Sequence, residues 1–179
     1  MTLLLGETAL SFSLPGVDGE MHSLGDYTDA RALAVVWSCN HCPYVMAWED
    51  RLNAIAHDYR DDGVRVVAIN SNDARTHPED SFEAMQERAH SKDFVFDYLQ
   101  DEEQSVAGAY EPERTPEVFL FDADRRLVYH GAIDDSRDEA NVKRRWLREA
   151  LDAVLAGRAP AVAETPAVGC TIKWRTAVS

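Results

Sequence analysis

The chain has 179 residues, enough for one domain with a sizeable core, and its 45% hydrophobic and 28% charged residues are ordinary for a globular protein. It carries 32 acidic and 18 basic side chains, a net charge of −14 that repels nucleic-acid phosphates and anionic membranes. No apolar stretch approaches the roughly 20 residues of a membrane helix. Because the apolar opening, residues 1–6, lacks the basic start of a signal peptide, we expect a cytoplasmic protein.

The first third of the chain predicts two types of element in alternation. Residues 10–14 are expected to form a short strand, with 20–22 pairing back on it as a hairpin. Residues 32–37 are a continuous apolar run, which is typical of a strand buried on both faces. Residues 43–60 carry apolar side chains at three- and four-residue spacing, which predicts a helix.

The middle of the chain continues this alternation. Residues 64–69 predict a second buried strand. A helix is expected over 79–90, because Pro78 and two acidic residues favour a helix start there. An extended segment over 94–99 and a short helix over 101–110 follow.

The last third predicts strands over 117–121 and 127–131, which are antiparallel because only a hairpin joins them. A final helix is expected over 139–155. The alternation is typical of an α/β domain in which strand–helix–strand units supply the parallel pairs. We expect one redox domain over residues 1–157 and a tail, 158–179, that packs on it.

Two of the three cysteines, Cys39 and Cys42, lie where a buried strand gives way to a helix. Two intervening residues let the sulfurs approach bonding distance. The unpaired N–H groups and the dipole of a helix start stabilise a thiolate, which is the nucleophile of disulfide exchange. We therefore expect Cys39 to attack and Cys42 to resolve, with no cofactor required.

Asn40 and His41 separate the two cysteines. A charged His41 can pair with the Cys39 thiolate, which stabilises the reduced form and makes the disulfide a stronger oxidant. This interpretation predicts a potential above the roughly −270 mV of thioredoxin. The alternative is an exposed histidine at a helix start with no role in the chemistry.

Residues 34–45, Ala-Val-Val-Trp-Ser-Cys-Asn-His-Cys-Pro-Tyr-Val, resemble the active-site segment of the thioredoxin-like redoxins. These include bacterial thiol-disulfide isomerase/thioredoxin proteins and the AhpC/TSA–TlpA-like branch. Residues 115–122, Thr-Pro-Glu-Val-Phe-Leu-Phe-Asp, resemble their second hallmark, and residues 167–174 also resemble this subgroup. The resemblance covers most of 8–175. It implies a thioredoxin-like fold: a central mixed sheet flanked by helices, with an N-terminal hairpin and an inserted helix.

In that superfamily the proline that corresponds to Pro116 follows a cis peptide bond and faces the sulfurs. The backbone of Thr115 would then be able to hydrogen-bond an incoming extended peptide. The resemblance implies that the following residues bind substrate or shape the site: Trp37, Asn40, His41, Pro43, Thr115 and Pro116. Trp37, beside a buried strand, is alternatively a core residue.

Some features depart from the family pattern. The buried acid of thioredoxin is replaced by Leu33 or an apolar neighbour, and Val36 stands three residues before Cys39, where peroxiredoxins have threonine. The expected function is thiol–disulfide oxidoreductase in cell redox homeostasis, with protein thiols or disulfides as partners and a reductase as electron donor. The alternatives are a thiol peroxidase and a non-catalytic interaction module.

Cys170 is open to two interpretations, a small buried hydrophobe or a third thiol near the pair. The non-catalytic alternative includes a zinc site, for which the candidate ligands are Cys39, His41, Cys42 and Cys170.

Overall fold

The structure, a computed structural model, describes residues 2–176. Its strands are β1 (Ser13–Pro15), β2 (Met21–Ser23), β3 (Ala32–Trp37), β4 (Val64–Asn70), β5 (Asp97–Gln100), β6 (Glu117–Phe121) and β7 (Leu127–Gly131). Its α-helices are α1 (Pro43–Tyr59), α2 (Phe82–Ser91), α3 (Ser105–Tyr110) and α4 (Trp146–Leu155). Short 3-10 turns are η1 (Leu24–Tyr27), η2 (Arg60–Asp62), η3 (Pro78–Asp80) and η4 (Glu139–Asn141). Within the described part of the chain, no helix is long and apolar enough to span a bilayer.

Five strands form the central sheet in the order β5-β4-β3-β6-β7. β3 and β5 both run parallel to β4, whereas β6 is antiparallel to β3 and to β7. β1 and β2 form a separate antiparallel hairpin. The α/β class, the central mixed sheet and the N-terminal hairpin expected from the sequence are confirmed.

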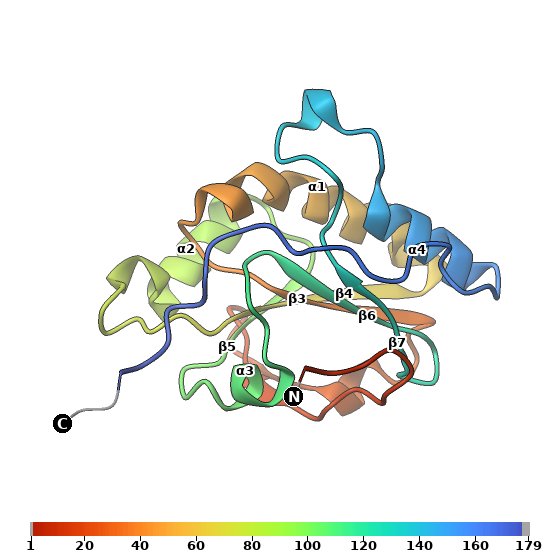
Figure 1. Cartoon of the computed structure of the whole chain (residues 1–179). Helices are drawn as coiled ribbons and strands as arrows, with labels where there is room; N and C mark the ends of the chain where they lie inside the picture. The colour runs from red at the N-terminus through yellow and green to blue at the C-terminus, as the bar shows by residue number, and fades with distance from the viewer. Residues whose placement is uncertain (1, 177–179) are drawn as a thin grey trace.

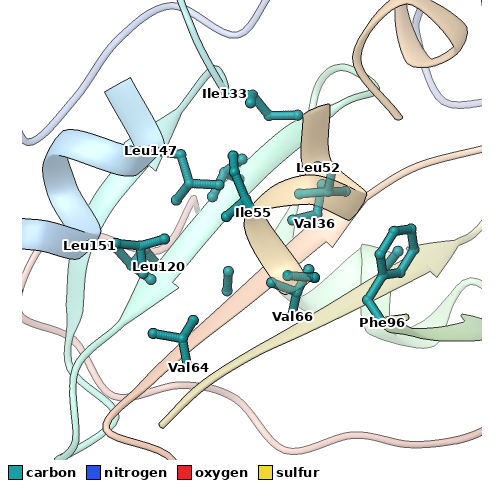
Figure 2. Close-up of a cluster of buried hydrophobic side chains, with 14 of the residues drawn as sticks. Val36, Leu52, Ile55, Val64, Val66, Phe96, Leu120, Ile133, Leu147 and Leu151 are labelled. Atoms are coloured by element: carbon teal, nitrogen blue, oxygen red, sulfur yellow. The ribbon is translucent and has the colours of Figure 1, made fainter. Parts of the chain in front are cut away.

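Helices α1, α2 and α4 cover one face of the sheet, and α3 and the N-terminal segment lie on the other (Figure 1). Successive side chains of a strand point to opposite faces. Val36 of β3 therefore packs with Leu52 and Ile55 of α1 and with Leu147 of α4, in the cluster drawn in Figure 2. Trp37, the next residue, packs into the second cluster on the α3 side. The continuous apolar run of β3 follows from this burial on both faces.

Helix α1 begins at Pro43, whose fixed φ suits the first helical position. Its buried stripe includes Val45, Trp48, Leu52 and Ile55, which face the sheet. Because β3 ends at Trp37, only residues 38–42 separate the central strand from the helix start. This short connection carries both cysteines of the predicted pair.

The predicted helix over 139–155 is wrong in its first half, since α4 begins only at Trp146. Side chains take the backbone donors in that region. The Asp138 carboxylate accepts the N–H of Ala140 at 3.1 Å, and the Asp135 carboxylate accepts the N–H of Lys143 at 2.9 Å. The first of these bonds caps the short turn η4, and the second competes with a continued helix, so residues 142–145 form a loop.

Other predicted elements are shifted at their ends for similar reasons. The expected helix over 79–90 is divided into η3 and α2, and the Ser81 hydroxyl caps α2 by accepting the N–H of Ala84 at 3.2 Å. The expected helix over 101–110 begins at Ser105. Its start is capped from outside by the Asp101 carboxylate, which accepts the N–H of Ala107 at 2.8 Å.

After α4 the tail crosses back over the molecule toward the α2 side (Figure 1). His130 of β7 exchanges backbone hydrogen bonds with the tail: its N–H donates to Ala163 at 2.9 Å, and its carbonyl accepts from Thr165 at 3.0 Å. Farther along, the Asp73 N–H donates to the Lys173 carbonyl at 2.8 Å. The tail therefore contacts both β7 and the loop after β4.

Candidate active site

The two cysteines of the pair lie at the carboxyl edge of β3. Ser38 still continues the ladder, because its N–H donates to the Ile69 carbonyl of β4 at 2.9 Å. Cys42 is the N-cap of α1, with extended backbone angles of φ −71° and ψ 127°. It is therefore Cys42, rather than Cys39, that stands at the start of the helix.

Thr115 lies against both sulfurs. Its hydroxyl oxygen is 3.7 Å from the Cys39 sulfur, and its carbonyl oxygen is 3.6 Å from the Cys42 sulfur. The bond from Thr115 to the buried Pro116 is cis, as the family resemblance implied. Both cysteines are free thiols with side chains almost fully buried.

Contact between the two sulfurs shifts the pKa values of the two thiols in opposite directions. A hydrogen bond with Cys39, helped by one with Cys170 and by the N–H of Val45, lowers the pKa of Cys42 to about 4. The same contact between sulfurs raises the pKa of Cys39, and burial and the charge of Asp80 raise it further. The contact thus favours ionisation of Cys42, at the start of α1, over that of Cys39.

Asp80, which the sequence did not single out, is a buried carboxylate behind the cysteine loop. It accepts hydrogen bonds from the N–H of Asn40 at 2.7 Å and from the side-chain amides of Asn70 and Asn72, both at 3.0 Å. Three donors keep the charge paired although the side chain has no exposure. This carboxylate thus fixes the backbone between the two cysteines, through the N–H of Asn40.

Asn40 is held from the other side by Tyr98 of β5, whose hydroxyl donates to the Asn40 side-chain oxygen at 2.8 Å. The Asn40 side-chain amide in turn donates to the Glu79 carbonyl at 2.9 Å. Asn70 ends β4 and Tyr98 lies on β5, whose carboxyl ends meet at the same sheet edge as that of β3. Polar residues at the carboxyl ends of parallel strands are therefore the feature of the sequence from which this network could have been predicted.

His41 pairs with carboxylates. One ring nitrogen lies 3.2 Å from the Glu79 carboxylate and the other 3.9 Å from that of Asp80, while the side chain is half-exposed. The first contact is within reach of an ion pair with a hydrogen bond, whereas the second, at 3.9 Å, is too long for a hydrogen bond. Pro43 lies beside the cysteines and begins α1.

Trp37 belongs to the core. It is fully buried, its ring packs on Tyr110 and Phe119 at centroid distances of 5.0 and 5.4 Å, and its indole N–H donates to the Ser71 hydroxyl at 3.1 Å. Of the two interpretations of Trp37, the structure favours the core residue over the one that shapes a substrate groove.

The backbone of Thr115 is already occupied. Its N–H donates to the Cys170 carbonyl at 2.8 Å, and its carbonyl accepts the Cys170 N–H at 3.2 Å. In the chain as folded here the tail fills that place as an antiparallel bridge, so binding of an incoming peptide there, which stays a prediction, requires displacement of the tail. Cys170 itself is half-buried against Cys39 and Cys42.

A cavity of about 230 Å³ opens over the sulfurs. It is lined by Cys39, His41, Cys42, Pro43, Asn72, His77, Cys170, Thr171 and Lys173. Three sulfurs from two distant segments thus share one small space. An ionised thiol beside a second thiol, reachable through a cavity, is the arrangement that disulfide exchange needs.

The AhpC/TSA family matches residues 5–130. The chain belongs to the AhpC/TSA family. A search of curated proteins gives no match. In this AhpC/TSA chain the position three residues before Cys39 is Val36, fully buried, and the position three before Cys42 is Cys39 itself.

Solved structures share the fold of this chain. A hypothetical protein of Sinorhizobium meliloti is 40% identical with a TM-score of 0.93, over 99% of this chain and 98% of that one. An uncharacterized conserved protein of Geobacillus kaustophilus is 41% identical with a TM-score of 0.93, over 99% and 95%. A putative thioredoxin of Neisseria meningitidis, 18% identical over 84% and 91%, has a TM-score of 0.66 and shows the shared thioredoxin-like fold.

Proposed function

We propose that this AhpC/TSA-family chain is a thiol–disulfide oxidoreductase in which Cys39 and Cys42 alternate between dithiol and disulfide. The observation that carries the proposal is that Cys39 and Cys42 pack together between β3 and α1, with both sulfurs in contact with Thr115. The cavity above them supplies access. The chemistry requires no cofactor, because the electrons reside in the two thiols.

In the reducing direction, the proton of Cys39 passes to Cys42, and the Cys39 thiolate attacks one sulfur of a substrate disulfide. The other substrate sulfur leaves as a thiolate and takes up the proton from Cys42, which thereby becomes a thiolate. Cys42 then attacks the Cys39 sulfur of the mixed disulfide, which closes the Cys39–Cys42 disulfide and releases the second substrate thiol. Two electrons have moved from the pair to the substrate, and the reverse sequence oxidises substrate thiols.

Insulin reduction in the presence of dithiothreitol tests this function. We expect the wild-type protein to accelerate precipitation of the insulin B chain, and Cys39→Ser and Cys42→Ser each to abolish the acceleration. In a trapping experiment, Cys42→Ser should accumulate mixed disulfides on Cys39, whereas Cys39→Ser should accumulate few. If Cys39→Ser is the better trap, Cys42 is the attacking sulfur. Full activity in both variants would refute the redox pair.

Membership of the AhpC/TSA family favours a second candidate, a thiol peroxidase. The apolar Val36 weakens it, since no hydroxyl stands three residues before Cys39. Peroxide consumption by wild-type protein and by Cys39→Ser separates the two functions. Turnover of peroxide that depends on Cys39 and exceeds the rate of a free thiol would establish the peroxidase.

We propose that the substrates are protein disulfides and that a reductase supplies the electrons. We also propose that residues 1–157 form the redox domain and residues 158–179 its tail. Metal analysis of the reduced protein tests the zinc alternative: one equivalent of zinc bound to the sulfurs would replace the redox role by a structural one. The cytoplasmic location stays a prediction.

A further inference from the structure

The tail is held at the site in a fixed register. Thr115 and Cys170 exchange both of their backbone hydrogen bonds, as directly opposed residues of an antiparallel pair do. Farther along, the Lys173 N–H donates to the Asn72 side-chain oxygen at 2.9 Å, and the buried Ile172 anchors the segment in the core. The position of Cys170 is therefore fixed by its hydrogen bonds with Thr115 and by the contacts of Ile172 and Lys173, which follow it in the chain.

Gly169 permits this approach. A Cβ at this position would lie 2.0 Å from the Thr115 carbonyl oxygen, a distance that no side chain tolerates, and this oxygen belongs to rigid backbone. The same carbonyl oxygen contacts the Cys42 sulfur. The absence of a side chain on Gly169 thus lets the tail bring Cys170 alongside the pair.

The third sulfur interacts with the second. Cys170 packs against Cys39 and Cys42 and lines the same cavity. Burial and a hydrogen bond with Cys42 raise the pKa of Cys170, and this hydrogen bond helps to lower the pKa of Cys42. Cys170 therefore lies beside the pair, within the same small cavity.

We propose that Cys170 is a third redox thiol of this site, which exchanges with the Cys39–Cys42 disulfide to form a Cys42–Cys170 disulfide. The Cys170 sulfur attacks the Cys42 sulfur, the bond between Cys42 and Cys39 breaks, and Cys39 leaves as a thiolate that takes up the proton given up by Cys170. No electrons are gained or lost overall, so the step needs no further oxidant. It rests on the proposed function, which supplies the first disulfide.

The exchange has a regulatory consequence. A Cys42–Cys170 disulfide ties the tail covalently over the backbone of Thr115, where an extended peptide would otherwise pair. At the same time it leaves Cys39 as a free thiol while the site stays oxidised. The oxidised protein therefore exists in two forms. One has the Cys39–Cys42 disulfide, and the other has the Cys42–Cys170 disulfide with Cys39 as a free thiol.

Peptide mapping of the wild-type protein tests this directly. The protein is oxidised with oxidised glutathione, its free thiols are alkylated, and the monomer band of a non-reducing gel is digested with trypsin. Cys39 and Cys42 both fall in the tryptic peptide 32–51, whereas Cys170 falls in 159–173. A Cys42–Cys170 disulfide joins the two peptides and carries an alkyl group on Cys39; a Cys39–Cys42 disulfide stays within one peptide.

Two variants sharpen the result. Cys39→Ser removes the competing disulfide, so we expect nearly all of its oxidised monomer to carry peptide 32–51 joined to 159–173. Gly169→Ala keeps all three thiols but displaces the tail from Thr115, so we expect the joined fraction to fall several-fold. Circular dichroism confirms that each variant is folded.

The outcomes separate the two proposals. If the wild-type protein closes the Cys39–Cys42 disulfide and reduces insulin but yields no joined peptides, even from Cys39→Ser, the third thiol is refuted and the oxidoreductase stands. An equal joined fraction in Gly169→Ala would also overturn the role of the tail. If neither disulfide forms within the wild-type monomer, the proposed function itself fails.

Discussion

Among single residues, the cysteine pair shows how a shared proton replaces a base. The acid that thioredoxin carries on its strand is absent from β3, and the proton that Cys39 holds is directed to the Cys42 sulfur. Each sulfur therefore sets the acidity of the other. Removing either one changes the chemistry of the one that remains.

The pH dependence of alkylation follows from this sharing. With the pKa of Cys42 at about 4, the reduced protein should react with iodoacetamide at a rate that stays nearly constant from pH 8 down to about pH 5. In Cys39→Ser the S–H that supports the Cys42 thiolate is gone, so the profile should move up toward the pKa of about 8.5 of an ordinary thiol. Cys42→Ser removes the thiol of low pKa, and burial and the charge of Asp80 still raise the pKa of the remaining Cys39, so its profile should not lie below that of an ordinary thiol. Mass spectrometry of time points gives the rates. A wild-type profile with a midpoint near 8.5 would contradict the shared proton.

Asp80 supports the same loop. Asp80→Asn places an amide group among three donors, so at least one loses its acceptor, and we expect a loss of about 1–3 kcal/mol in the free energy of unfolding. The variant also removes the negative charge that raises the pKa of Cys39. Urea unfolding measures the stability.

Glu79→Gln is the matched control for Asp80→Asn. Its carboxylate is partly exposed and pairs with His41, so the change should cost less than about 1 kcal/mol. Equal losses in the two variants would show that the carboxylate of Asp80 has no special place in the network.

At the scale of elements, hydrophobic pattern was enough for the centre of the sheet. The bounds of β3, β6 and β7 agree with those predicted, because each is an apolar run with hairpin or turn residues at its ends. The hydrophobic pattern failed for residues 139–155. The carboxylates of Asp135 and Asp138 accept hydrogen bonds from backbone N–H groups there, which the spacing of apolar residues does not reveal. Propensity is local, whereas these carboxylates act through the folded backbone.

The loop before α4 is tied to α1 by a buried ion pair. Arg51 donates to the Asp134 carboxylate at 2.7 Å, the same carboxylate accepts the Trp48 indole N–H at 2.7 Å, and both charged side chains are almost fully buried. Asp134→Asn leaves the Arg51 charge without a counter-charge, so we expect a loss of about 3–5 kcal/mol in the free energy of unfolding.

The exposed pair of Arg144 and Glu149 is the control for this loss. Both side chains are about half-exposed, at 47% and 48%, so Glu149→Gln should cost less than about 1 kcal/mol. Chemical unfolding of both variants gives the comparison. A loss below about 1 kcal/mol in Asp134→Asn would mean that the pair does not hold the loop to the helix.

Over the whole molecule, the site is assembled from segments that only the fold brings together. The CxxC motif was visible in the sequence because it is local. The contact of Thr115 with Cys170 joins residues 55 positions apart, and that of Asn40 with Asp80 joins residues 40 positions apart. No spacing rule connects such pairs, so the occupied Thr115 backbone and the Asp80 network became evident only in three dimensions.

The acidity of the pair also extends to the stability of the whole reduced protein. Cys42 has a pKa of about 4 in the folded state and about 8.5 in the unfolded chain, so its contribution is fully present above pH 8.5 and is lost as the pH falls toward 4. Cys39, with a raised pKa, contributes below pH 8.5 and loses this contribution as the pH rises. The contribution of the pair is therefore largest near pH 8 and declines on both sides.

The reference for this prediction is the double variant Cys39→Ser/Cys42→Ser, which lacks both ionisations and keeps Cys170. Thermal unfolding of the two reduced proteins between pH 5 and pH 9 should give a difference in Tm that favours the wild type most near pH 8 and shrinks toward pH 5. The carboxylates and histidines titrate alike in both proteins, so their effect cancels in the difference. A difference in Tm that is constant across this range would mean that the two sulfurs ionise in the folded protein as they do in the unfolded chain, and that the thiolate at the start of α1 gains nothing from its surroundings.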